Sequence, residues 1–193
     1  MLIAITGGIG GGKSEVVKIL SGLTDNVVSA DKINAELLND AEYIKKISAE
    51  FPETVKGGAI DKKALSAIIF SDEKRRARLN EIAHAAIKDA LFQRLRAMKG
   101  AAFAEVPLLR EAGLQDGFDE VWLVVSDRDK RISRLKADRG MSETEILSVM
   151  NAQACDETRA SAAYRIIENN GSTDELKDKV TAMFFDTYEK NKL

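Results

Sequence analysis

The chain has 193 residues, of which 45% are hydrophobic and 31% charged, and its formal net charge is −2. These values are typical of a globular protein with a sizeable core, and they give no electrostatic basis for binding nucleic acid or an anionic membrane. The single cysteine, Cys155, excludes an intrachain disulfide and a cysteine metal cluster, so we expect it to be a packing residue in a reducing cytoplasmic setting. No apolar run approaches the roughly 20 residues of a membrane helix, and we expect the first residues to form a strand rather than a signal peptide.

A glycine-rich segment directly follows the first apolar run of the chain. Residues 7–14 read GGIGGGKS and fit the phosphate-loop pattern G-x-x-x-x-G-K-[ST], with an apolar strand before it and a helical pattern after it. Its backbone N–H groups and the positive end of the following helix would cradle phosphate oxygens. Lys13 would reach the β- and γ-phosphates, and the Ser14 hydroxyl would bind Mg²⁺. The loop residues expected to contact ATP are Gly8, Gly10, Gly11, Gly12, Lys13 and Ser14.

Apolar runs alternate with helical patterns along the rest of the chain, which predicts an α/β fold with a mostly parallel sheet. Ser172 is expected to cap the last helix. The predicted strands are residues 2–6, 26–29, 101–106, 120–125 and 165–168.

The spacing of these strands predicts a single domain with two insertions. Helical apolar spacing occurs in residues 31–38, 41–51, 62–70 and 72–98, so the stretch 31–99 is too long for a single crossover. Residues 127–156 are rich in lysine and arginine. One insertion would hold an acceptor, and the other would close as a lid over the triphosphate and exclude water. The core would comprise residues 1–30, 100–126 and 157–193.

Candidate catalytic side chains follow the strand ends, where doubly wound sheets bind their ligands. Asp31 could orient or deprotonate an attacking hydroxyl, or it could cap the helix that follows. Glu105 could support Mg²⁺ or pair with a nearby base. Leu108 and Leu109 lie in an apolar turn suited to lining a pocket.

Other polar residues allow both a functional and a structural interpretation. Arg131, Arg134 and Arg139 could neutralise a transferring phosphoryl group, or they could form a solvated helix face balanced by nearby aspartates. His84, the only histidine, lies in a long helical pattern where a structural role is the usual one. Asn169 follows the last strand and could contact a nucleotide base or simply form a turn.

Taken together, these motifs resemble the dephospho-coenzyme A kinase family over nearly the whole chain. The resemblance implies ATP-dependent phosphorylation of the ribose 3′-hydroxyl of dephospho-coenzyme A, the last step of coenzyme A synthesis. It also implies a three-layer P-loop fold of the nucleoside-monophosphate-kinase type, with a parallel five-stranded sheet, a helical acceptor-binding insert and a helical lid. The matching segments are 6–14 (TGGIGGGKS), 29–31, 60–70 (IDKKALSAIIF), 79–87 (LNEIAHAAI), 106–111 (VPLLRE), 131–135, 140–142, Gln153 and 167–172 (IENNGS).

The resemblance implies a role for each matching position. Asp31, Lys13 and Arg134 match catalytic positions. The positions that match ATP contacts outside the loop glycines are Lys13, Ser14, Glu15, Arg134, Arg139 and Asn169. The positions that match the acceptor pocket are Asp31, Lys62, His84, Leu108, Leu109 and Glu111.

The chain departs from the family pattern at several positions near these sites. Ser29 stands where the family commonly has aspartate, and Glu15 stands where it has serine or threonine. Asp138 and Arg139 reverse the usual order, which moves the second lid arginine by one residue, about 100° around a helix.

Two alternative functions stay open at the level of sequence. One is a P-loop kinase for another small acceptor, such as a nucleoside monophosphate, and the other is a non-catalytic, nucleotide-dependent regulator. The helical insert and the basic lid favour a kinase, and we find no N-K-x-D-like motif of the kind that GTPases use to read their base. The expected partner is a small molecule, and the sequence does not distinguish a monomer from a small homo-oligomer.

Overall fold

The computed structural model describes residues 1–153 and 165–190, so Cys155 and the end of the predicted lid lie outside the described residues. The chain forms two compact units. Unit 1 comprises Met1–Val28 and Leu95–Leu193, and unit 2 comprises Ser29–Arg94, which shares residues 31–94 with the predicted helical insert.

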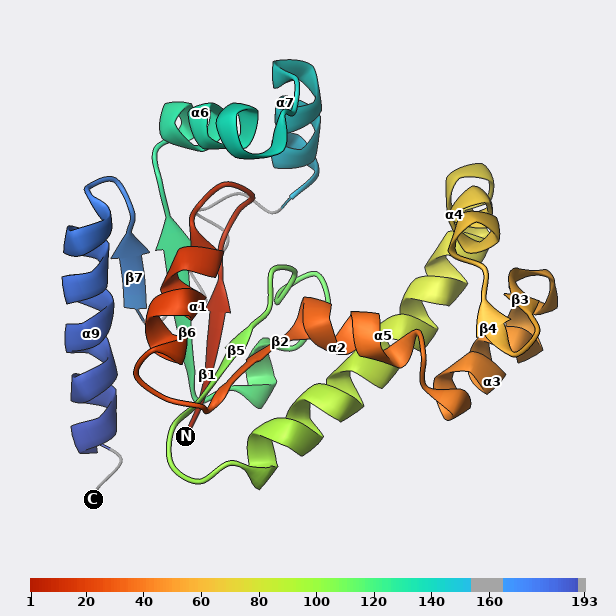
Figure 1. Cartoon of the computed structure of the whole chain (residues 1–193), viewed down its shortest axis with the longest axis horizontal. Helices are drawn as coiled ribbons and strands as arrows, with labels where there is room; N and C mark the ends of the chain where they lie inside the picture. The colour runs from red at the N-terminus through yellow and green to blue at the C-terminus, as the bar shows by residue number, and fades with distance from the viewer. Residues whose placement is uncertain (154–164, 191–193) are drawn as a thin grey trace. The chain divides into compact units, whose positions relative to one another are not determined.

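Unit 1 is built on a parallel sheet whose strand order is β2-β5-β1-β6-β7 (Figure 1). The central strand β1 is in register with β5 through Leu2 and Ala102, and with β6 through Ile3 and Glu120. The predicted three-layer α/β fold is therefore confirmed, and the phosphate loop leaves the sheet from its central strand. The strand bounds are Leu2–Thr6 (β1), Val27–Ser29 (β2), Ala102–Glu105 (β5), Glu120–Val125 (β6) and Arg165–Glu168 (β7).

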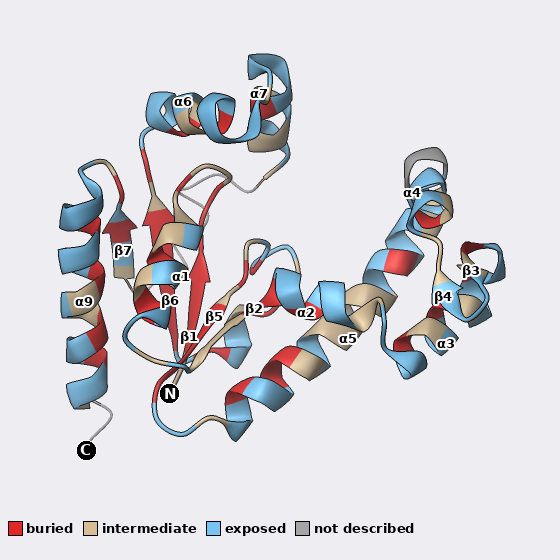
Figure 2. Ribbon diagram, viewed as in Figure 1, coloured by how far each residue is buried: buried red, intermediate tan, exposed pale blue. Residues whose placement is uncertain are grey.

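The helices α1 and α9 pack against each other beside this sheet. The core contains three close aromatic rings, with centroids 5.3 Å apart for Phe103 and Trp122 and 5.9 Å apart for Phe103 and Phe184. Figure 2 shows the buried residues along the strands and along one stripe of α9. The helix bounds in unit 1 are Lys13–Ser21 (α1), Arg128–Arg139 (α6), Glu143–Ala152 (α7) and Thr173–Lys190 (α9), with a short 3-10 helix at Gln115–Gly117.

The first turn of α9 is held by reciprocal hydrogen bonds. The Ser172 hydroxyl accepts from the Glu175 N–H at 3.2 Å, and the Glu175 carboxylate accepts from the Ser172 N–H at 2.9 Å. These two bonds satisfy N–H groups that have no partner within the helix. The prediction that Ser172 caps the last helix is confirmed.

Unit 2 has a small core of its own, formed by Tyr43, Ile47, Phe51, Leu65 and Leu79. The bounds of its elements are Ala30–Leu37 (α2), Ala41–Glu50 (α3), Pro52–Thr54 (a 3-10 helix), Val55–Lys56 (β3), Ala59–Ile60 (β4), Lys62–Ser71 (α4) and Glu73–Ala97 (α5), the last of which continues into unit 1. Among the described helices, none combines the length and the apolar character needed to cross a membrane.

The hairpin of β3 and β4 was not predicted from the sequence. Each strand has two residues, which is too short for an alternating apolar pattern to be visible. The turn between them is made by Gly57 and Gly58, whose φ angles are 58° and 79°. Two successive positive φ values are typical of the tight turns that join antiparallel strands.

Candidate active site

The predicted phosphate loop connects β1 to α1 in unit 1. Gly12 precedes the helix in a left-handed conformation, with φ 98° and ψ 22°. The Lys13 ammonium donates to the carbonyl oxygens of Gly7 at 2.9 Å and Gly8 at 3.1 Å, so its charge lies over the loop. Ser14 is exposed in the first turn of α1, where N–H groups favour anionic ligands.

Asn169 ties the end of β7 to this loop. Its side-chain Nδ2 donates to the Gly11 carbonyl at 3.0 Å, and the residue is 7% exposed. A Cβ atom on Gly12 would lie only 1.9 Å from that Nδ2. Glycine is therefore required at position 12 both for its backbone conformation and for the space that Asn169 occupies.

Arg134 reaches the same strand end from α6. Its guanidinium donates to the Asn169 carbonyl at 3.0 Å and to the Ser126 hydroxyl at 3.2 Å. The Ser126 hydroxyl in turn donates to the Asn169 carbonyl at 2.9 Å. The structure thus brings together three predicted features, namely the phosphate loop, Arg134 and Asn169.

Arg131 and Gln153 also contact the loop, although neither was predicted from the sequence to do so. The Nε of Arg131 donates to the Ile9 carbonyl at 2.8 Å, and the Ile9 N–H donates to the Gln153 side chain at 2.9 Å. Arg131 is only 9% exposed. The available signal was its position three residues before Arg134, because side chains with this spacing share a helix face.

Four other predicted residues of unit 1 lie after β5 or in α6. After β5, Leu109 is buried, whereas Leu108 and Glu111 are exposed. Arg139 is exposed in the last turn of α6. Five residues separate it from Arg134, which corresponds to about 140° around the helix, so these two arginines do not share a face.

Asp31, Lys62 and His84 belong to unit 2. Asp31 is exposed within the first turn of α2, and Ser29 occupies the N-cap position. The prediction that Asp31 could cap this helix is therefore wrong, because the helix already includes Ala30. Lys62 is exposed at the start of α4, and His84 is half-buried in α5.

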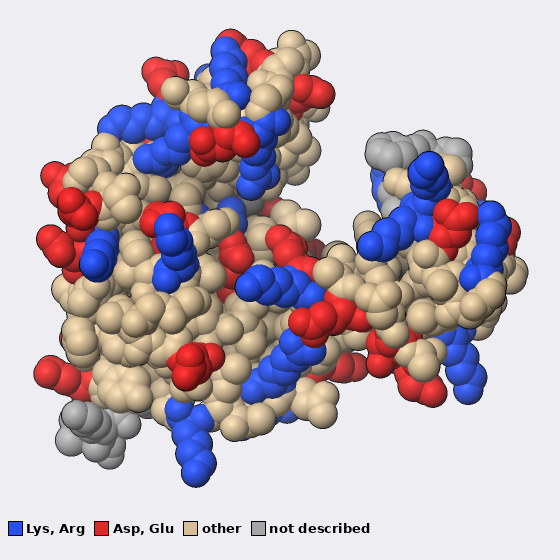
Figure 3. Space-filling model, viewed as in Figure 1, with Lys and Arg blue, Asp and Glu red and all other residues tan. Residues whose placement is uncertain are grey.

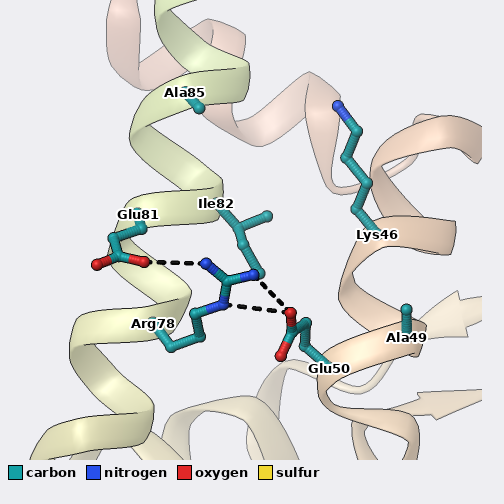
Figure 4. Close-up of a pocket in the computed structure, with 7 residues that line it drawn as sticks. All are labelled: Lys46, Ala49, Glu50, Arg78, Glu81, Ile82 and Ala85. Carbon is teal, nitrogen blue, oxygen red and sulfur yellow. Dashed lines mark hydrogen bonds and ion pairs between the residues drawn. The ribbon is translucent and has the colours of Figure 1, made fainter.

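Unit 2 also has a surface pocket of about 390 Å³ between α3 and α5 (Figure 4). Arg78 spans it, donating to Glu50 at 2.6 Å and to Glu81 at 3.0 Å. The hydrogen bond from Arg78 holds the pKa of the Glu50 carboxyl below its usual value, and both carboxylates raise the pKa of Arg78. The Arg78–Glu50 ion pair joins α5 to α3, whereas the Arg78–Glu81 pair lies within α5. No residue predicted for the active site lines the pocket.

Charge on the protein surface is mixed in sign. Figure 3 shows lysine and arginine side chains interspersed with aspartate and glutamate on the face in view. Among the residues that the structure describes, no group of three or more His, Cys, Asp or Glu side chains could hold a metal ion by itself.

Comparison with known proteins gives a consistent result. The family model for dephospho-CoA kinase matches residues 1–175. Dephospho-CoA kinase of Geobacter sulfurreducens is 38% identical over 186 residues, covering 93% of this chain and 94% of that protein. The enzyme of the same name from Thermus thermophilus is 32% identical and covers 95% of this chain and 90% of its own.

Solved structures show the same fold. A Thermus thermophilus structure superposes with a TM-score of 0.82 at 31% identity, covering 96% of this chain and 97% of that one. Dephospho-CoA kinase from Campylobacter jejuni gives a TM-score of 0.75 at 23% identity, with 98% of both chains covered. Shikimate kinase from Acinetobacter baumannii gives 0.58 at 14% identity, covering 96% of this chain and 93% of that one, which extends the likeness of fold to another kinase.

Proposed function

Because the chain belongs to the dephospho-CoA kinase family and is a transferase that uses ATP to phosphorylate dephospho-CoA, we propose how its own residues carry out that reaction. The observation that supports the proposal most directly is the loop between β1 and α1. There, the Lys13 ammonium, the N-terminus of α1 and the Arg134 guanidinium are held within one unit. This set of donors suits a triphosphate, whose charge must be neutralised at several oxygens.

In the proposed reaction, the 3′-oxygen of the acceptor ribose forms a bond to the γ-phosphorus of ATP. The bond from that phosphorus to the β–γ bridging oxygen breaks, and ADP leaves with the electron pair. Asp31 orients the hydroxyl and receives its proton. Lys13 turns from the carbonyls of Gly7 and Gly8 to the β- and γ-phosphate oxygens, and Arg134 stabilises the charge that develops during transfer.

Ser14 is the residue that we propose as the protein ligand of Mg²⁺. Its exposed hydroxyl in the first turn of α1 is a hard oxygen donor. One such donor fits this ion, which keeps several waters and takes its other ligands from substrate phosphates. When bound with ATP, Mg²⁺ would supply neutralisation of the phosphate charge.

The other residue roles are proposed from the family resemblance. Lys62, His84, Leu108, Leu109 and Glu111 would contact dephospho-CoA. Glu15, Arg139 and Asn169 would contact ATP, and Asn169 already touches the Gly11 carbonyl of the loop. The single cysteine of the chain supports the proposal that it acts in a reducing cytoplasmic setting.

The test of the proposed mechanism is the variant Asp31→Ala, with Asp31→Asn as a second variant of nearly unchanged shape. Both should fold and bind ATP but lose phosphoryl transfer by at least about a hundredfold, the low end for a general base. Asp174→Asn is a matched control, because Asp174 is also an exposed carboxylate in the first turn of a helix, α9. Asp174→Asn removes one negative charge from a helix N-terminus, as Asp31→Asn does, but Asp174 is not among the residues proposed to bind the acceptor.

The assay follows ATP consumption with and without dephospho-CoA and measures the product mass. A second series replaces dephospho-CoA with mononucleotides, which tests the choice of acceptor. Near-normal turnover by Asp31→Ala would show that this carboxylate neither positions nor deprotonates the acceptor hydroxyl.

A further inference from the structure

The peptide groups on both sides of Ile9 are fixed by residues from outside the loop. Gln153, next to the end of α7, accepts the Ile9 N–H at 2.9 Å, and Arg131 of α6 donates to the Ile9 carbonyl at 2.8 Å. In the Gly8–Ile9 peptide group, the Gly8 carbonyl also accepts a hydrogen bond from the Lys13 ammonium at 3.1 Å. Two successive peptide planes of the loop are therefore oriented by side chains.

The planarity of the peptide bond gives these contacts a consequence for phosphate binding. In a trans peptide, the carbonyl of one residue and the N–H of the next point in opposite directions. Arg131 holds the Ile9 carbonyl, so it also sets the direction of the Gly10 N–H. The direction of such N–H groups decides whether a phosphate loop forms a nest for an anion.

The same arginine occupies the space next to Gly8. A Cβ atom at position 8 would lie 2.3 Å from Nη2 and 2.8 Å from Cζ of Arg131. Gly8 is not one of the described glycines with positive φ, so its backbone conformation is open to alanine. A side chain at this position would therefore collide with the guanidinium as it is placed in the structure.

We propose that Arg131 is a positioning residue for ATP, which acts with Gln153 to hold the Ile9 peptides so that the Gly10 N–H is directed toward the triphosphate. The proposal rests on the assignment of ATP to this loop. Removing the guanidinium would let the Ile9–Gly10 peptide rotate, and ATP would then have to order the loop when it binds. None of the residues proposed to bind the acceptor belongs to this arrangement, so acceptor binding should be unaffected.

The experiment compares Arg131→Ala and Arg131→Lys with the unaltered protein. We expect Arg131→Ala to raise both the Kd and the KM for ATP about tenfold or more, the factor expected for one hydrogen bond from a charged group, with KM for dephospho-CoA unchanged. Arg131→Lys should recover part of the loss, because an ammonium can still donate to the Ile9 carbonyl. Arg128→Ala removes an exposed arginine one turn earlier on α6 and should leave ATP binding unchanged.

A double-mutant cycle with Gly8→Ala tests the geometry independently. The new methyl group should displace the guanidinium and weaken ATP binding by itself, but it should add little once Arg131 is alanine. If Arg131→Ala does not fold, the single variants Gly8→Ala and Arg131→Lys still test the proposal, because each should weaken ATP binding.

Two results would overturn the proposal. One is an ATP Kd for Arg131→Ala within about twofold of the unaltered protein, and the other is fully additive effects in the Gly8 cycle. A purely structural role would lower the melting temperature of Arg131→Ala while leaving its ATP affinity intact well below that temperature. The unaltered protein is measured first, so a failure to bind ATP there would count against the proposed use of the loop and not against Arg131.

Discussion

The substitution Gly12→Ala provides a quantitative test of the loop geometry. Gly12 has φ 98°, and a Cβ there would lie 1.9 Å from Nδ2 of Asn169. Two independent penalties follow from these values. One is the cost of a left-handed conformation for a residue with a side chain, and the other is the loss of the hydrogen bond from Asn169 to the Gly11 carbonyl.

Both penalties can be given a magnitude. The left-handed conformation costs about 1–2 kcal/mol for a residue with a Cβ. Displacing Asn169, which is 7% exposed, leaves a buried amide without its acceptor at a cost of about 1–3 kcal/mol. We therefore expect the free energy of unfolding of unit 1 to fall by about 2–5 kcal/mol, and ATP affinity to fall with it because the loop must move.

The assay is urea denaturation followed by tryptophan fluorescence. Trp122 is the single tryptophan of the sequence and is fully buried in unit 1, so its signal reports on the unit that holds the loop. Gly22→Ala is the matched control, because Gly22 follows the other end of α1 with φ −81°, which alanine readily adopts. This control should change the unfolding midpoint little.

The Asn169→Ala background separates the two penalties. With the amide removed, Gly12→Ala should lose the part of its cost that comes from the collision and keep only the conformational part. An equal cost in both backgrounds would refute the collision argument. A Gly12→Ala protein as stable as the original would refute the loop conformation itself.

Two further predictions concern stability. Glu120 accepts a hydrogen bond from the buried indole N–H of Trp122 at 3.0 Å and pairs with Arg165 at 3.4 Å. Glu120→Ala should therefore lower the free energy of unfolding, measured by urea denaturation, by about 2–4 kcal/mol, and Glu120→Gln should lower it by less. Equal unfolding midpoints for Glu120→Ala and the original protein would contradict this prediction. In unit 2, the hydrogen bond from Lys56 holds the pKa of Asp61 below its usual value. The ionised Asp61 carboxylate therefore stabilises the fold above the unfolded-state pKa of about 4, and this stabilisation is lost as the pH falls through the lower folded-state pKa. Asp61→Asn should therefore remove part of the loss of helical circular dichroism between about pH 5 and pH 2, and an unchanged acid transition would argue against the prediction.

The parts of the fold that could be predicted from sequence are those governed by local rules. Three of the predicted strands, β1, β6 and β7, begin and end at the predicted residues. β1 and β6 are mostly buried, apolar runs, which have clear boundaries in the sequence. The phosphate loop was recognisable because glycines, lysine and serine must stand at fixed spacing to wrap a phosphate. The Ser172 cap followed from its place before a helical pattern.

Two other local features were not predictable, because the sequence pattern does not mark their boundaries. The hairpin at Gly57 and Gly58 is held by only two short strands, whose pairing leaves no pattern in the sequence. Asp31 falls inside α2 rather than at its cap, because the N-cap is Ser29, two residues earlier than the predicted cap. Differences of one or two residues are common at helix ends.

The sequence by itself determined the kind of protein, since the phosphate loop and the order of the motifs identify a kinase of the dephospho-CoA kinase family. Only the tertiary structure decided which side chains hold that loop. Arg131, Gln153 and Asn169 lie more than a hundred residues from Ile9 and Gly11 in the sequence, yet they are within hydrogen-bonding distance in space. The physical reason is that a helix pattern specifies spacing along one segment, whereas the choice of which buried arginine faces the loop is made by packing between segments.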